Sequence, residues 1–350
     1  MSTRTVRRRG AAVVALAAAL TLTACGAGTT DKAGTGSASP QADAGGKKSV
    51  AQGGKDFGDA RAKTAAMGTD AKPGQFPRTV THAMGTTEIK AAPQRVVVLD
   101  VGELDNVVSL GIKPVGFAPA EGDPDLPSYL AQDGGTPKSV GTINSLNLEA
   151  IAALKPDLIL GSQLRAADKY KELSKIAPTV FSLRPGFTWK ENYLLNAAAL
   201  DKTAEAKAKL AAYEAKAKKL GEAVGADKPT ISMVRYLPDR IRLYARASFI
   251  GVILDDAGLP RPKNQQIDDL ATEVSPENID AADADWIFTG VYGDVKKTKR
   301  DTAEANPLWK NLKAVKSGQA VDVPDETWYL GLGVTAADKV LDDLSGHLVK

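Results

Sequence analysis

One long helical stripe constrains the fold of this 350-residue chain more than any other feature. After Asp201, a plausible N-cap, the stripe recurs at alternating spacings of three and four, at Thr203, Ala206, Leu210, Tyr213, Ala217, Leu220 and Val224. This spacing predicts one continuous helix, about 35 Å long at 1.5 Å per residue. Lys and Glu fill the rest of its surface, which we interpret as solvent-exposed. A rod of this length is about as wide as a small domain.

The segments on either side of this helix share a frame. LEAIAALKPDLILG (148–161) and PENIDAADADWIFTG (276–290) each read as a short helix followed by a buried strand that ends in Gly. At identical spacing, Glu149, Ile151, Asp157 and Ile159 match Glu277, Ile279, Asp285 and Ile287. Because the two copies flank the long helix, we expect two similar lobes joined by one rigid rod.

Strands and helices alternate within both halves. RVVVLD (95–100) predicts a buried strand, ELDNVVSLGI a helix that ends at Gly111, and KPVGFA the next strand. This alternation predicts an α/β fold of two Rossmann-like lobes, each with a mainly parallel sheet covered by helices. We expect an N-terminal lobe over 76–190, the linking helix within 191–228 and a C-terminal lobe over 229–350.

The first 75 residues read as a leader and a tether. Residues 1–24 combine four Arg residues with a short apolar run, which is typical of a secretory signal peptide. LTAC (22–25) resembles a bacterial lipobox, in which Cys25 would carry a diacylglyceryl thioether and hold the protein on the outer face of the cytoplasmic membrane. The alternative is an ordinary signal peptide with an incidental Cys. Residues 25–75 are rich in Gly, Ser, Ala and Lys and predict a flexible tether.

The charge balance argues against a nucleic-acid partner. Of the 45 Lys and Arg residues, four lie in segment 1–24, which leaves 41 against 42 Asp and Glu. No basic run is interleaved with aromatic residues. Cys25 is the only Cys, so no disulfide can form within the chain.

The order of these segments resembles the binding proteins of iron-siderophore and cobalamin importers, which serve ATP-driven uptake. RVVVLD, LNLEAIAALKPDLIL, the long helix, SFIGVILDDAGL, SPENIDAADADWIF and WKNLKAVKSGQAVDV fall where that family has them, over about residues 78–349. VRYLPDRIRLYARASFIG and TWYLGLGVTAADKVLDDL carry a finer resemblance to binders of ferrioxamine-type hydroxamate siderophores. The resemblance implies a monomeric receptor that passes its cargo to an ABC permease dimer.

Nothing in the sequence predicts an enzyme or a metal centre of its own. The chain has two histidines, His82 and His347, near opposite ends of the predicted folded part. It has neither a His-Glu-x-x-His nor a Gly-x-Ser-x-Gly motif. A siderophore already satisfies Fe(III) with its own oxygens, so we expect no cofactor, no catalytic residues and no protein ligands to iron.

Strand ends give the candidate cargo residues, since ligands of open α/β sheets bind beyond the carboxyl ends of strands. Arginines supply planar donors and aromatic side chains supply apolar walls. The candidates are Arg184, Arg235, Tyr236, Arg246 and Tyr292 at strand ends, with Trp189, Phe249 and Trp328 in adjoining loops or helix starts.

The resemblance also gives Glu149 and Glu277 a role, because matching glutamates of the family pair with arginines of the permease. Helix capping is the alternative for both residues. For the whole chain, the alternatives are haem or cobalamin as cargo, or a lipid-anchored hydrolase.

Overall fold

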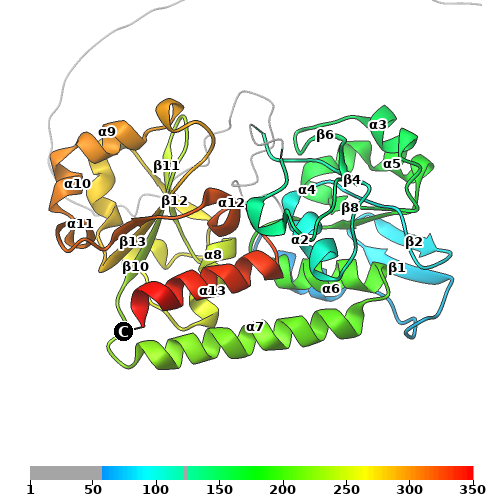
Figure 1. Ribbon diagram of the computed structural model, residues 1–350, viewed down its shortest axis with the longest axis horizontal. Coiled ribbons are helices and arrows are strands. Elements are labelled where there is room, and N and C mark those ends of the chain that lie inside the picture. The colour runs from blue at the N-terminus through cyan, green and yellow to red at the C-terminus, as the bar shows by residue number, and fades with distance from the viewer. Residues whose placement is uncertain (1–56, 122–124, 350) are drawn as a thin grey trace, which may run out of the picture. The chain divides into compact units, whose positions relative to one another are not determined.

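The computed structural model describes residues 57–121 and 125–349, which form the two expected lobes (Figure 1). The sheet of the N-terminal lobe has the order β5-β4-β3-β8-β9, and all four pairings are parallel. Its strands are β3 (Val96–Val98), β4 (Gly116–Phe117), β5 (Lys138–Ser139), β8 (Leu158–Ser162) and β9 (Thr179–Ser182). This arrangement confirms the predicted α/β fold.

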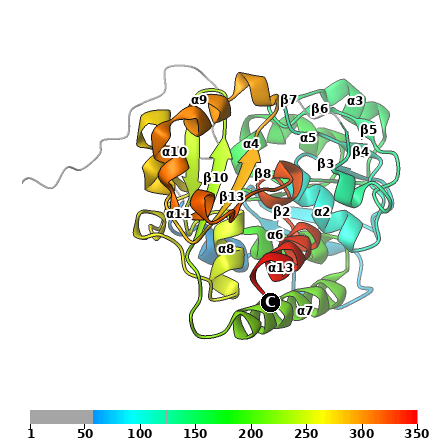
Figure 2. The ribbon, with the colours of Figure 1, turned by 60° about the vertical axis from the view of Figure 1, so that its left-hand side comes forward.

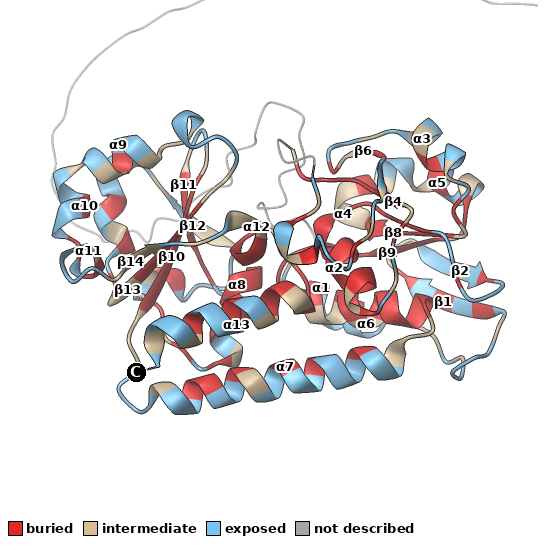
Figure 3. Ribbon diagram, in the orientation of Figure 1, coloured by how far each residue is buried: buried red, intermediate tan, exposed pale blue. Residues whose placement is uncertain are grey.

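Short helices and two hairpins complete the N-terminal lobe. The helices are α1 (Ala60–Ala65), α2 (Val101–Ser109), α3 (Leu148–Ala153), α4 (Gln163–Ala166), α5 (Tyr170–Ile176) and α6 (Trp189–Ala199), with 3₁₀ turns η1 (Ser128–Leu130) and η2 (Ala167–Lys169). The hairpins are β1 (Arg78–His82) with β2 (Gly85–Ile89), and β6 (Gly141–Thr142) with β7 (Ser145–Leu146). Strands β3, β4, β8 and β9 of the sheet are buried throughout, whereas the edge strand β5 is exposed (Figure 3).

Helix α7 (Thr203–Val224) is the predicted rod. Five positions of the predicted stripe, Ala206, Leu210, Tyr213, Ala217 and Leu220, are buried, while the other face is exposed (Figure 3). The helix ends at Gly225, whose φ of +91° is a conformation that suits glycine.

The C-terminal lobe has a mixed sheet of order β12-β11-β10-β13-β14. Its strands are β10 (Ile231–Tyr236), β11 (Ile241–Tyr244), β12 (Ala271–Val274), β13 (Trp286–Val291) and β14 (Ala320–Asp322). Strands β10, β13 and β14 are parallel, whereas β11 and β12 join by antiparallel pairing. Its helices are α8 (Phe249–Asp256), η3 (Lys263–Gln265), η4 (Pro276–Ala282), η5 (Val295–Lys297), α9 (Arg300–Ala305), α10 (Pro307–Asn311), α11 (Lys313–Lys316), α12 (Asp325–Trp328) and α13 (Val334–Leu348).

The internal repeat has a structural counterpart in both lobes. The Asp157 carboxylate accepts hydrogen bonds of 2.8 Å from the backbone N–H groups of Gln94 and Arg95, just before β3. Asp285 accepts bonds of 2.7 and 2.8 Å from the backbone and hydroxyl of Thr230, just before β10. In each lobe the matched Asp therefore fixes the chain as it enters a central strand.

A buried carboxylate connects the two lobes. Asp105 of α2 is fully buried, and its two oxygens accept backbone hydrogen bonds of 3.0 Å from Thr335 and Ala336, in the first turn of α13. A side chain at Gly333 would collide with Asp105, since an added Cβ would lie 2.4 Å from the Asp105 Cγ. Helix α13 also packs along α7 (Figures 1 and 2). The lobes are thus joined by α7 and by this capped helix.

The predicted tether ends too late in the sequence. Residues 57–75 were expected to be flexible, yet α1 lies within them and packs on α6. Ala60 and Thr64 are buried, and the Thr64 hydroxyl donates to the Ala60 carbonyl at 2.8 Å. Small side chains let this helix approach closely, which a search for large apolar residues overlooks. No helix in the described part of the chain is long and apolar enough to cross a membrane.

His82 gives the fold a specific pH dependence. Its Nδ1 accepts from the backbone N–H groups of Met84 and Phe181, both at 3.3 Å. Its Nε2 lies 2.9 Å from the Thr87 hydroxyl oxygen, whose own proton is donated to the Thr179 carbonyl. Burial lowers the pKa of His82 to about 4. A proton on Nδ1 would face two backbone donors, so this site favours the neutral ring.

We predict that His82→Gln flattens the acid limb of the stability profile. Because the pKa of His82 is lowered from 6.5 to about 4 in the fold, its contribution is complete above pH 6.5 and lost as pH falls toward 4. The melting temperature of the wild type should therefore fall more steeply over this range than that of the variant. His347→Gln, which removes an exposed histidine, is the control. Equal slopes for wild type and His82→Gln would contradict the prediction.

Candidate functional site

Polar side chains of both lobes lie at or just beyond the ends of parallel strands. We call Arg165, Arg184, Arg235 and Tyr292 the strand-end cluster. Arg165 and Arg184 follow β8 and β9 of the N-terminal lobe, while Arg235 and Tyr292 lie at the ends of β10 and β13 of the C-terminal lobe. Burial raises the pKa of Tyr292, and the charges of Arg235 and Arg165 oppose this rise. Arg165 therefore acts on a side chain of the opposite lobe.

Arg235 is buried and engaged by a carboxylate of its own lobe. Its Nε donates to Asp325 Oδ1 at 2.6 Å, and its Nη2 donates to Asp325 Oδ2 at 2.5 Å. Its Nη1 donates to the Tyr244 hydroxyl at 3.2 Å, and its Cζ lies 4.7 Å from the centre of the Tyr292 ring. Burial works to lower the pKa of Arg235, but Tyr244 and Asp325 raise it well above its usual range. Arg235 therefore stays charged, and its contact with the ring helps to fix the position of Tyr292.

Arg184 is buried beside two aromatic rings that contact each other. Its Cζ lies 4.3 Å from the ring centre of Phe57 and 5.2 Å from that of Phe187. Burial lowers the pKa of Arg184 to about 10, with Asp269 raising it and Arg165 lowering it. The guanidinium is therefore charged at neutral pH, and a carboxylate of the other lobe lies within its electrostatic reach.

Arg165 and Glu103 were missed by the sequence interpretation. Arg165 Nε donates to Asp100 Oδ2 at 2.9 Å, while Asp100 Oδ1 accepts from the Val101 backbone at the start of α2. Burial, and then the charge of Asp100, raise the pKa of Glu103 to about 8, which favours the protonated carboxyl. Arg165 follows the strand LILGS (158–162), so the strand-end rule that selected Arg184 could have found it. No sequence signal marks Glu103, whose burial depends on tertiary packing.

Arg246 does not lie beside Arg235 and Tyr292. Strand β11 is antiparallel to β10, with Arg242 opposite Arg235, so its carboxyl end lies beside the amino end of β10. The expectation that Arg246 shares an edge with Tyr292 is therefore wrong. The exposed Arg246 Nε instead pairs with Asp255 at 3.6 Å and with Asp268 at 3.8 Å.

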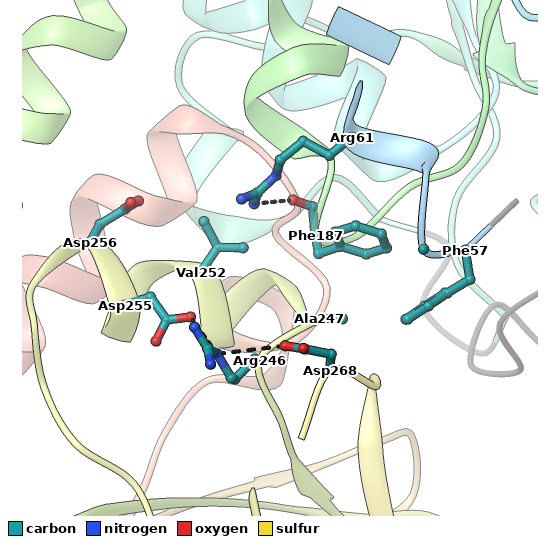
Figure 4. A pocket seen from close by; sticks show the side chains of 10 residues that line it. Phe57, Arg61, Phe187, Arg246, Ala247, Val252, Asp255, Asp256 and Asp268 are labelled. Carbon is teal, nitrogen blue, oxygen red and sulfur yellow. Dashed lines mark hydrogen bonds and ion pairs between the residues drawn. The ribbon is translucent and has the colours of Figure 1, made fainter. Parts of the chain in front are cut away.

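A pocket of about 400 Å³ lies beside Arg246 (Figure 4). Residues of three chain segments line it. They are Phe57, Gly58 and Arg61 near α1, Phe187 before α6, and Arg246, Ala247, Val252, Asp255, Asp256 and Asp268 of the C-terminal lobe. Its charged lining consists of three carboxylates and two guanidinium groups.

Four predicted cargo residues lie in the core. Trp189, Tyr236 and Trp328 have no exposed surface, and Phe249 is 3% exposed. Trp189 packs edge-on against Tyr213 and Phe249 at 5.0 and 5.8 Å. Trp328 stacks on Phe288 at 4.8 Å and donates its indole N–H to Asp343. Tyr236 packs against Trp309. These large aromatic side chains therefore stabilise the core and do not form a solvent-facing wall.

Glu149 and Glu277 are both exposed at the start of short helices. Asn147, not Glu149, caps α3, through a 2.9 Å bond from the Ala150 N–H. A hydrogen bond from Ser275, followed by one from its own backbone N–H, lowers the pKa of Glu277. Capping therefore involves Glu277 more than Glu149. Cys25 lies outside the described residues.

No group of three or more His, Cys, Asp or Glu side chains that could hold a metal ion occurs within residues 57–121 and 125–349. His82 and His347 lie on separate elements, β1 and α13. The donors at the strand ends are guanidinium and phenol groups, which suit hydrogen bonding to an oxygen-rich organic ligand.

Comparison with known families agrees with this architecture. The periplasmic binding protein family matches residues 96–327. The chain belongs to this family.

Three relatives show how far the likeness extends. The probable siderophore-binding lipoprotein YfiY of Bacillus subtilis is 40% identical over 287 residues, which cover 78% of this chain and 88% of YfiY. The Fe(3+)-citrate-binding protein YfmC of the same organism is 34% identical, covering 76% of this chain and 84% of YfmC.

The third is a crystal structure, Staphylococcus aureus SirA complexed with staphyloferrin B. It is 37% identical with a TM-score of 0.69, and the match covers 77% of this chain and 98% of that chain. These relatives confirm the predicted family, and the family is one of binding proteins.

Proposed function

We propose that this chain is a lipid-anchored extracytoplasmic receptor that binds a ferric siderophore between its lobes and delivers it to an ABC importer. The observation that carries this proposal is the strand-end cluster, in which both lobes present charged or phenolic donors to one region. The names of the relatives, which include siderophore-binding lipoproteins, support the same cargo. Anchoring would occur through Cys25.

The arginines of the strand-end cluster are balanced by carboxylates, which favours a cargo of low net charge. Asp100 neutralises Arg165, Asp325 neutralises Arg235, and the charge of Asp269 acts on Arg184. Three hydroxamates cancel the charge of Fe(III), whereas three catecholates leave a triply negative complex. A site whose arginines are already balanced gains little from a strongly anionic ligand. We therefore favour a ferric hydroxamate, in keeping with the ferrioxamine-type resemblance. Haem and cobalamin are the alternatives.

Titration of the purified protein tests this cargo. We predict saturable quenching of Trp fluorescence by ferrioxamine or ferrichrome, and weaker or no binding of ferric citrate, a tris-catecholate complex, haem or cobalamin. Arg184→Gln should weaken hydroxamate binding about ten- to a hundredfold, since a hydrogen bond from a charged donor contributes about 1.5–3 kcal/mol. Arg240→Gln, at an arginine paired with Asp239 and Glu273, should bind as the wild type does. Preference for haem or cobalamin would refute the proposed cargo.

The matched glutamates support a two-point contact with the permease. Glu149 and Glu277 are exposed at equivalent positions of the repeat. Each precedes the matching aspartate of its lobe, Asp157 or Asp285. A two-fold symmetric partner presents two similar basic patches, which two similar acids on a pseudo-symmetric receptor can meet. Exposed ion pairs are each weak, about 0–1 kcal/mol, but they orient the encounter.

We predict that Glu149→Ala combined with Glu277→Ala leaves siderophore binding in solution unchanged but abolishes uptake and stimulation of the transporter ATPase. Two other exposed glutamates, Glu88 on β2 and Glu222 on α7, provide the control. Their double replacement should transport normally. Normal uptake by the Glu149 and Glu277 double variant would contradict the docking role, and it would leave Glu277 with its local contact to Ser275 alone.

A further inference from the structure

The segment between the predicted tether and the first sheet contacts one of the candidate cargo residues. Helix α1 packs on α6, and Arg61 Nη2 donates to the Phe187 carbonyl at 3.0 Å. Arg61 also pairs with Glu191 of α6 at 3.4 Å. Just before α1, the ring of Phe57 lies 4.9 Å from that of Phe187. These contacts fix residues 57–66 on the N-terminal lobe at the level of α6.

The guanidinium carbon of Arg184 lies over the ring of Phe57. The Cζ of Arg184 lies 4.3 Å from the Phe57 ring centre and 5.2 Å from that of Phe187. The backbone of Arg184 is fixed as well, because its carbonyl accepts bonds of 2.8 Å from Thr188 Oγ1 and Asn192 Nδ2. Contact with the two rings, together with the fixed backbone, limits the directions in which the guanidinium can turn.

The same segment reaches the other lobe through the pocket of about 400 Å³. Phe57, Gly58 and Arg61 form one wall, and α8 with Arg246 forms the opposite wall (Figure 4). In Figure 4 the Arg61 guanidinium reaches the Phe187 carbonyl, and Phe57 lies near Phe187. Residues 57–61 therefore border both a buried arginine and a space shared by the two lobes.

We propose that Phe57 is a positioning residue that orients Arg184 for cargo binding, and that docking of residues 57–66 is thereby coupled to cargo binding. This inference rests on the proposed function of Arg184. An oriented guanidinium loses less freedom when its edge donors meet the siderophore oxygens. By linkage, bound cargo holds the docked segment more firmly, since the coupling acts equally in both directions. The protein end of the predicted tether would then sense whether the site is loaded.

Replacement of Phe57 tests the orienting role. Phe57→Ala and Phe57→Leu should weaken ferric hydroxamate binding about five- to thirtyfold, the range from an exposed to a desolvated cation–π contact. Phe57→Leu keeps most of the side-chain volume, so it separates loss of the ring from loss of packing. Phe57→Trp keeps an aromatic face over Arg184 and should restore affinity to near that of the wild type.

A second phenylalanine–arginine stack in the chain provides the matched control. Arg78 lies over Phe76 with its Cζ 4.4 Å from the ring centre, and it donates to Asp201 and to the Ala198 carbonyl. Phe76→Ala removes a similar stack that holds no strand-end residue, so it should lower the melting temperature without changing affinity.

Hydrogen exchange tests the coupling. In the wild type, loading with ferric hydroxamate should slow exchange of the α1 amides, whose backbone bonds include Lys63 N–H to Asp59 and Ala66 N–H to Ala62. The slowing should be absent in Phe57→Ala. The proposal would be overturned if Phe57→Ala and Phe57→Leu bound cargo as tightly as the wild type, or if either bound it more tightly. It would also be overturned if cargo left the exchange of the α1 amides unchanged. Neither result would affect the proposed receptor function. Failure of the wild type itself to bind any ferric siderophore would overturn both.

Discussion

The arrangement of the two lobes depends on the buried carboxylate of Asp105. It lies on the N-terminal lobe and accepts the first backbone N–H groups of α13, which belongs to the C-terminal lobe. Burial raises the pKa of Asp105 to about 6, against the lowering effect of these two backbone bonds. The α13 N-terminus also favours negative charge there. Because Gly333 leaves no room for a side chain beside Asp105, this contact holds the two lobes in one close register.

The cargo region follows from that register. Helix α13 packs on α7 and on α2 of the N-terminal lobe, so it holds the two lobes in place against each other. Arg165 then acts electrostatically on Tyr292, and Asp269 acts on Arg184, across the boundary between lobes. Two further hydrogen bonds cross this boundary directly. The backbone N–H of Ser128 donates to Glu326 at 3.0 Å, and the Tyr129 hydroxyl donates to the Gly331 carbonyl at 3.3 Å. A receptor with this many cross-lobe contacts presents a largely preformed site.

Features set by local periodicity were predictable, and features set by tertiary contacts were not. The stripe of α7 and the matched frames around Glu149 and Glu277 follow from spacing, and both appear in the fold. The strand-end rule correctly placed Arg184 and Tyr292 after β9 and β13, but it misplaced Arg246 because the antiparallel direction of β11 is set by its pairing with β10. Trp189 and Trp328 were expected to face ligand, yet packing partners from distant segments bury them. Helix α1 was overlooked because its buried residues are small.

The central claim is that the lobes are already held in their cargo-binding arrangement before cargo arrives. Small-angle scattering of the empty and siderophore-loaded protein measures this most directly. The account predicts nearly coincident curves, with lobe rotation on loading of no more than about 10°, as expected for preformed sites. A clear decrease in the radius of gyration on loading would show that the lobes close around cargo, and it would contradict the role of Asp105 and α7 in holding the lobes in one arrangement.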